Sequence, residues 1–118
     1  MDGEISPDEV ADLLESEAAV RIVDIRDSRS FERGHISASE NVPFHELPAR
    51  IDEFEGADRV VTVCPHGKAS VQAARLIGSY EGSADARVES MAGGLAEWAE
   101  RYDLVADDAE TDEPEAPF

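Results

Sequence analysis

Cys64 is the residue best placed to do chemistry, and it is the only cysteine among the 118 residues. It follows an apolar-biased run at 59–63 (RVVTV) and opens a short loop at 65–69 (PHGKA). An amphipathic stretch comes next, at 70–80. A strand, a loop and a helix in that order place the thiol at the carboxyl edge of a sheet, facing helix amides that lower a thiol pKa. Because the thiolate is the nucleophilic form, this position favours a reactive cysteine over a core cysteine.

The loop after the cysteine is predicted to bind an anion. Its consecutive backbone amides can curl around the sulfur, and Gly67 permits the positive-φ turn that such amide nests use. Lys68, the only lysine in the chain, adds positive charge that also favours the thiolate. Pro65 lacks an amide proton, so the donors are expected from His66 onward. The candidate site is therefore Cys64 as nucleophile, with a binding loop made of Pro65, His66, Gly67, Lys68, Ala69 and Ser70.

Strand and helix patterns alternate along the chain and predict an α/β domain around a mostly parallel central sheet. The expected strands are 20–25, 41–42, 59–63 and 87–90. The expected helices are 7–15, 28–33, 46–55, 71–80 and 95–102. Ser6 and Glu9 form a capping box at the first helix start, with Pro7 between them. One domain is expected over 1–105, followed at 106–118 by an acidic, disordered tail with six acids and no base.

Five short motifs together resemble the rhodanese family of sulfurtransferases. In chain order they are VDIR at 23–26, FERGHI at 31–36, NVP at 41–43, CPHGKAS at 64–70, and MAGG at 91–94 followed by Trp98. Each motif is weak alone, but five in the family's order and spacing are specific. The resemblance covers almost everything from Ile5 to Leu104. It implies a three-layer rhodanese-like fold in which helices flank the central sheet.

The resemblance implies a sulfurtransferase that carries sulfane sulfur as a Cys64 persulfide and needs no cofactor. The thiolate would take sulfur from thiosulfate, expelling sulfite, or from a persulfide donor. The acceptor would be cyanide, a thiol or a protein thiol, and the amides of 65–69 would cradle the transferred sulfur. Asp24 and Arg26 would mostly hold neighbouring loops in place, although Arg26 could instead attract an anionic substrate.

The same fold can serve functions other than sulfur transfer from thiosulfate. Rhodaneses resemble cysteine phosphatases that place an arginine six residues after the cysteine, but this chain has Ser70 there and lacks that phosphate clamp. A rhodanese fold can also serve as a binding module, for which loss of the cysteine is the usual mark, yet Cys64 is kept. An intermediate alternative is a sulfur relay between proteins, without significant thiosulfate turnover.

The charge balance is strongly acidic, with 28 acidic against 10 basic residues and a net charge of −18. This excess, with a single lysine, resembles the cytoplasmic proteins of extreme halophiles, in which salt screens self-repulsion. The alternative is an acidic face for a basic partner, but the acids are scattered along the whole chain. Nucleic-acid binding is not expected, because no basic patch could neutralise phosphates.

Several further expectations come from what the sequence lacks. No signal peptide or membrane-spanning run is visible, and one cysteine provides no internal disulfide, so a soluble cytoplasmic protein is expected. Three dispersed histidines and one cysteine predict no metal site. His35 is expected to be structural, His45 has no supporting context, and His66 could either tune the thiolate or face solvent.

Overall fold

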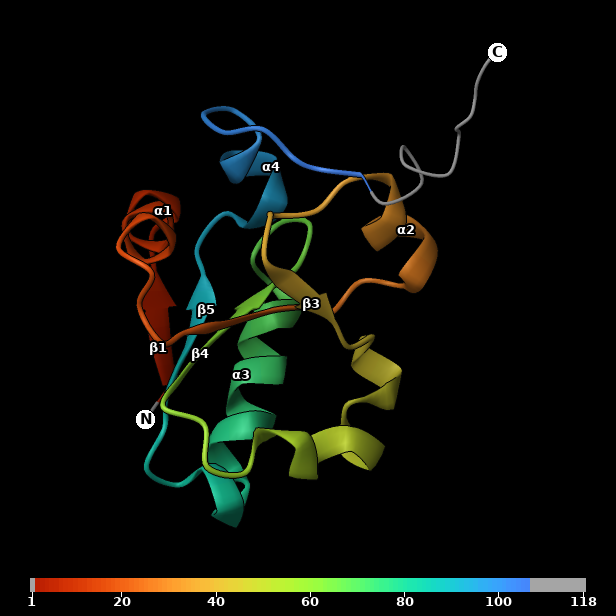
Figure 1. The fold of residues 1–118 in the computed structure, drawn as a ribbon. Coiled ribbons are helices and arrows are strands. Elements are labelled where there is room, and N and C mark those ends of the chain that lie inside the picture. Colours follow the sequence, from red (N-terminus) through yellow and green to blue (C-terminus); the bar gives the residue numbers. More distant parts are fainter. Residues whose placement is uncertain (1, 107–118) are drawn as a thin grey trace.

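A five-stranded parallel sheet, covered by helices, forms the framework of the computed structural model, which describes residues 2–106 (Figure 1). The strands are β1 (Asp2–Ile5), β2 (Arg21–Asp24), β3 (Ser39–Asn41), β4 (Arg59–Val63) and β5 (Arg87–Met91). Their order across the sheet is β1-β5-β4-β2-β3, and each neighbouring pair is parallel. The predicted three-layer α/β fold is confirmed, with a sheet that is entirely parallel over the described residues.

Helices and 3₁₀ segments connect these parallel strands, except α4, which follows the last strand, β5. The α-helices are α1 (Pro7–Glu15), α2 (Ser28–Arg33), α3 (Ala69–Ser79) and α4 (Gly94–Trp98). Three 3₁₀ segments are η1 (Phe44–Glu46), η2 (Pro48–Phe54) and η3 (Glu81–Ser83). The capping box of α1 is present, since the Glu9 amide donates to Ser6 Oγ and the Ser6 amide to Glu9 Oε1, both at 3.1 Å. An N-cap of this kind stabilises a helix by about 1 kcal/mol.

The α-helix predicted at 46–55 is wrong in type. The chain there forms η1 and η2, in which the Leu47 amide donates to Phe44 O and the Arg50 amide donates to Leu47 O. Pro48 does not explain the difference, because it stands in the first turn of η2, where a backbone amide has no helical partner to lose. The apolar spacing was informative all the same, since Leu47 and Phe54 are fully buried.

Strand β1 was not predicted at all. Its sequence, DGEI, holds two acids and a glycine, which are poor strand formers. The strand lies at the edge of the sheet and pairs only with β5. The main-chain pairing with β5, rather than its side-chain pattern, therefore makes this segment a strand.

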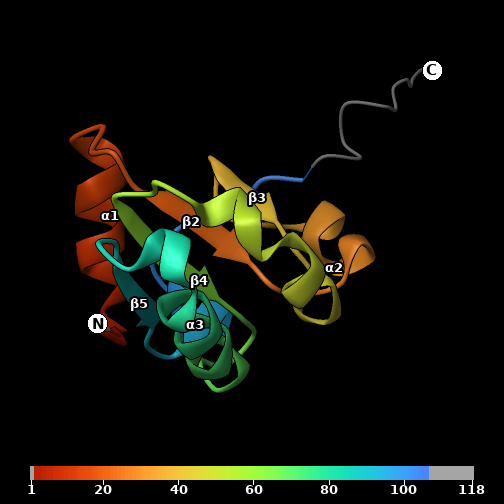
Figure 2. The same cartoon turned by 90° about the horizontal axis from the view of Figure 1, so that it is seen from below.

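Two hydrophobic clusters lie on opposite faces of the sheet. The view from below shows α1 and α3 as separate layers of the molecule (Figure 2). The cluster under α3 and η2 includes Val23, Val60, Val88, Ala73 and Ile77. The cluster under α1 and α4 includes Ile22, Val61, Met91, Val10 and Trp98. Successive strand residues thus alternate between faces, and this period of two places Cys64 on the α3 face with Val60.

Candidate active site

Cys64 is the first residue after β4, in the loop between β4 and α3. Figure 1 shows this green loop above the end of α3 and beside the blue α4. The predicted order of strand, loop and helix is present, and the loop lies at the carboxyl edge of the parallel sheet. The cysteine residue is only 2% exposed, so its surroundings decide whether the sulfur can ionise.

Backbone amides of the loop point at this sulfur. The Gly67 amide donates to Sγ at 3.0 Å, and the Ser70 amide donates to it at 3.3 Å. Gly67 has a φ of 83°, in the left-handed region that a glycine adopts without strain. A Cβ at this position would also lie 2.8 Å from the Gly93 nitrogen, so both backbone conformation and space require glycine. The loop therefore forms a nest of inward-facing donors around the sulfur.

The Ser70 side chain adds a hydroxyl to this nest. Ser70 Oγ lies 3.3 Å from Sγ, and it can donate its proton once the sulfur is a thiolate. The residue is fully buried at the start of α3, and its carbonyl accepts a hydrogen bond from Thr62 Oγ1 at 2.7 Å. The hydroxyl of Ser90, on β5, lies 2.6 Å from Ser70 Oγ. Sequence reasoning included Ser70 but missed Ser90.

The balance of these effects lowers the pKa of Cys64. Burial by itself raises the pKa of this thiol, because a buried charge loses its hydration. The Ser70 hydroxyl and the amides of Ser70, His66 and Gly67 act in the opposite direction and outweigh burial. The sulfur is therefore buried, and its pKa still lies below the ordinary value of a thiol.

Lys68 does not contribute in the expected way. Its side chain is exposed, and it makes no hydrogen bond or ion pair within residues 2–106. Neutral donors, rather than the ammonium group, account for the lowered pKa of Cys64. Lys68 instead lies with Pro65, His66 and Ala69 on the exposed outer side of the loop.

A second glycine turn supports the loop from the other side. Gly93 and Gly94 have φ values of 74° and 63°, and they lead into α4. A Cβ at Gly94 would lie 2.6 Å from the amide nitrogens of both His66 and Gly67. The next two amides donate into the loop, Leu95 to Cys64 O at 2.9 Å and Ala96 to Pro65 O at 3.0 Å. The sequence predicted a break at Gly93-Gly94, but not that this turn holds the cysteine loop.

Asp24 and Arg26 are brought together at the end of β2. Arg26 Nη2 lies 2.8 Å from Asp24 Oδ2 and donates to Gly34 O at 2.6 Å. Asn41 Nδ2 donates to the carbonyls of Asp24 and Arg26, at 3.0 and 2.9 Å. These bonds join β2, the end of α2 and β3. The geometry supports the loop-holding role for this pair, because the guanidinium already bonds protein acceptors.

The histidines differ in setting. His35 is 5% exposed, stacks on Phe31 at a centroid distance of 3.8 Å, and has Nδ1 2.6 Å from Phe31 O. Its amide and carbonyl pair with those of Val105. His66 is exposed on the loop, and His45 Nε2 lies 3.8 Å from Glu46 Oε2.

Within residues 2–106, no group of three or more acidic, histidine or cysteine side chains could hold a metal ion. No helix in that range is long and apolar enough to cross a bilayer.

Comparison with known proteins places this site in a family. A profile of the rhodanese-like domain matches residues 6–101. The thiosulfate sulfurtransferase GlpE of Pseudomonas aeruginosa is 37% identical over 98 residues, which cover 83% of this chain and 84% of the relative. The crystal structure of a rhodanese-related protein from Thermoplasma volcanium is 27% identical, with a TM-score of 0.68, and the match covers 86% of this chain and 96% of that one. A thiosulfate sulfurtransferase structure from Pseudomonas aeruginosa has a TM-score of 0.75 at 22% identity, over 90% of this chain and 20% of that one, which bears on the fold alone.

Proposed function

The chain belongs to the family of rhodanese-like domains and is a sulfurtransferase-type enzyme, and from this premise we propose that it carries sulfane sulfur as a persulfide on Cys64. The donor is thiosulfate or a persulfide, and the acceptor is cyanide, a small thiol or a protein thiol. The observation that carries the proposal is the nest of donors around Sγ, formed by two amides and the Ser70 hydroxyl. Asp24 and Arg26 hold the segments after β2 and α2 and the end of β3 together, and we assign them no contact with the substrate.

The first step loads the sulfur. The Cys64 thiolate attacks the outer sulfur of thiosulfate, a new S–S bond forms, and the S–S bond within thiosulfate breaks. Sulfite leaves with the bonding electron pair, so no oxidant or reductant is consumed. The inward amides favour this step because they stabilise the attacking thiolate before the donor arrives.

The second step unloads it. A thiolate or cyanide attacks the outer sulfur of the persulfide and leaves the Cys64 thiolate behind. The same amides and hydroxyl stabilise the sulfur that regains its charge. Pro65, His66, Lys68 and Ala69 line the exposed side of the loop and are the residues that a donor or acceptor would meet. The single free cysteine suits a reducing, cytoplasmic setting.

Mass spectrometry tests the proposal directly. The protein is incubated with thiosulfate in concentrated salt, digested, and searched for one added sulfur on the peptide that contains Cys64. We expect the added sulfur in the wild type and its loss after cyanide is supplied, while Cys64→Ser gains none. A wild type that stays unloaded, or a Cys64→Ser variant that still converts thiosulfate and cyanide, would contradict the proposal.

A sulfur relay is separated from a thiosulfate enzyme by comparing two rates. The relay predicts slow loading from thiosulfate and rapid loading from a persulfidated protein, with Cys64 as the acceptor in both. A binding module that needs no turnover predicts no loading from either donor.

A further inference from the structure

Two strands of the sheet hold Ser70, the residue that gives the sulfur both an amide and a hydroxyl. Alternate residues of β4 and β5 face α3, where Val60 and Val88 pack into the core under this helix. Thr62 and Ser90 occupy the next positions along the same face. Thr62 binds the Ser70 carbonyl at 2.7 Å, and the Ser90 hydroxyl lies 2.6 Å from the Ser70 hydroxyl.

Ser90 is a polar side chain in a place that packing alone would fill with a hydrocarbon. It is 1% exposed, and a buried hydroxyl without a hydrogen bond is destabilising. Within residues 2–106, its side-chain hydrogen bond is the one to Ser70 Oγ. Within residues 2–106, Ser90 makes no hydrogen bond to the sulfur, so we expect its effect on Cys64 to pass through Ser70.

Counting protons gives this pair a direction. A serine hydroxyl has one proton to donate. When Cys64 is a thiolate, the Ser70 hydroxyl donates its hydrogen bond to Sγ. The Ser70 oxygen can then only accept a hydrogen bond in its short contact with Ser90. Ser90 must therefore donate to Ser70. We propose that Ser90 is a positioning residue, whose buried hydroxyl directs the Ser70 proton toward Sγ and so favours the ionised cysteine.

The arrangement stabilises the thiolate more than the thiol. In a series of hydroxyls that each donate to the next, every hydrogen bond strengthens its neighbour. A hydrogen bond to a charged acceptor is also stronger than one to a neutral group. In the thiol state the direction of donation can reverse, so that the S–H donates to Ser70 and Ser70 donates to Ser90. The extra strength of a hydrogen bond to a charged sulfur is then lost. This inference rests on the proposed function, but it concerns the ionisation of Cys64 and can be measured without turnover.

The pKa of Cys64 in Ser90 variants tests the inference. The thiolate is followed by its ultraviolet absorbance against pH, with Cys64→Ser as the blank, and one cysteine makes the signal unambiguous. The tyrosines interfere little, since a hydrogen bond to Asp8 raises the pKa of Tyr102, and partial desolvation with nearby Glu55 raises that of Tyr80. We expect Ser90→Ala to raise the pKa of Cys64 and to slow persulfide formation at neutral pH by about tenfold.

A double variant shows whether Ser90 acts through Ser70. The pKa of Cys64 in the double variant Ser70→Ala with Ser90→Ala should equal its pKa in Ser70→Ala alone. The isosteric pair Ser90→Thr and Ser90→Val separates hydroxyl from packing, because both add the same bulk and only threonine keeps the proton. We expect threonine to hold the pKa below that of valine, and this comparison stands even where Ser90→Ala fails to fold.

Ser83→Ala is the matched control. Ser83 is 2% exposed and donates to Ile77 O at 2.5 Å, near the other end of α3, so its loss removes a buried hydroxyl away from the sulfur. We expect it to leave the pKa of Cys64 unchanged. A Ser90→Ala pKa that matches the wild type, or equal values for Ser90→Thr and Ser90→Val, would overturn the inference. A wild type that never loads sulfur while Ser90→Ala still raises the pKa would overturn the proposed function alone.

Discussion

At the scale of single residues, ionisation of Cys64 depends on neutral donors. Burial opposes the charge, and the hydrogen bonds from Ser70, His66 and Gly67 outweigh it. This differs from a thiolate held by a nearby cation, because hydrogen bonds to a buried sulfur are little affected by dissolved salt. A reactive thiolate that must persist in concentrated salt is well served by such an arrangement.

Substituting Lys68 separates the two ways of lowering a thiol pKa. Because the Lys68 ammonium is exposed and forms no bond within residues 2–106, we expect Lys68→Ala to leave the pKa of Cys64 unchanged. The rate of persulfide formation should rise with pH through a midpoint below the ordinary thiol pKa and level off above it, in both proteins. The pH profile of single-turnover loading measures this midpoint. A clear rise of the midpoint in Lys68→Ala would restore the charge-based explanation.

The reactive residue could be found from the sequence, but the group behind it could not. Cys64 was identified because it follows an apolar strand pattern and precedes a glycine loop, all within a few positions. Ser90 lies on another strand, and a serine is more often exposed than buried. Only the pairing of β5 with β4 brings it to the first turn of α3. The predicted contribution of Lys68 stays a prediction, because sequence proximity does not fix where a long side chain points and the ammonium forms no ion pair within residues 2–106.

At the scale of elements, two glycine turns from distant parts of the chain pack against each other. The turn at Gly67 surrounds the sulfur, and the turn at Gly94 fits against its backbone. The first amides of α4 then donate to the carbonyls of Cys64 and Pro65. The start of α4 thus holds the main chain of the loop, which leaves the inward amides free to face Sγ.

Adding one methyl group at Gly94 tests this packing. The new Cβ would lie 2.6 Å from two loop amides, at a φ of 63°, so we expect Gly94→Ala to lower the free energy of unfolding by about 1–3 kcal/mol. It should also slow persulfide formation, because the loop must move away. Gly78→Ala is the control, since Gly78 lies in α3 with nothing within 4 Å of its Cβ. That change should stabilise the fold by about 0.5–1 kcal/mol and leave loading intact. Urea unfolding and single-turnover loading report both quantities, and equal effects of the two variants would refute the packing role.

Elements with a clear local pattern could be predicted, and those that depend on distant partners could not. The capping box fixed the start of α1, and the β-branched run fixed β4. Strand β1 has no such pattern and exists through its bonds to β5. The helical spacing around Pro48 indicated the buried Leu47 and Phe54, but not the choice of 3₁₀ over α-helical hydrogen bonds.

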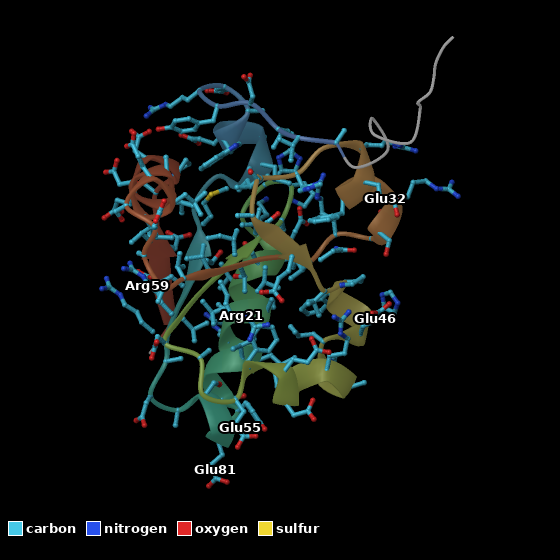
Figure 3. All side chains as sticks on the ribbon, viewed as in Figure 1. Arg21, Glu32, Glu46, Glu55, Arg59 and Glu81 are labelled. Carbon is cyan, nitrogen blue, oxygen red and sulfur yellow. The ribbon has the colours of Figure 1, made fainter. Side chains whose placement is uncertain are left out.

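At the scale of the whole molecule, the net charge of −18 is the dominant feature. Figure 3 shows Glu32 on α2 and, at the opposite end of the molecule, Glu55 and Glu81. Glu32 thus lies far from the other two carboxylates, and adaptation to salt, expected from the scatter of acids along the sequence, stays a prediction. The expected acidic tail lies almost entirely at 107–118, outside the described residues, and stays a prediction.

Removing salt should therefore weaken the fold. Repulsion among the surface carboxylates reaches further as ionic strength falls, so we expect the urea midpoint to drop steadily on dialysis from molar salt to dilute buffer. Circular dichroism at each salt concentration gives the midpoint. Full ellipticity and an unchanged midpoint in dilute buffer would contradict the halophilic interpretation. The pKa of Cys64, measured where the protein is folded, should change far less than the midpoint.

The near-complete enclosure of the cysteine has a practical consequence for the purified protein. At 2% exposure, the sulfurs of two copies cannot approach to bonding distance without opening their loops. Storage in air should therefore leave the chains uncrosslinked, even though the hydrogen bonds to the thiol lower its pKa.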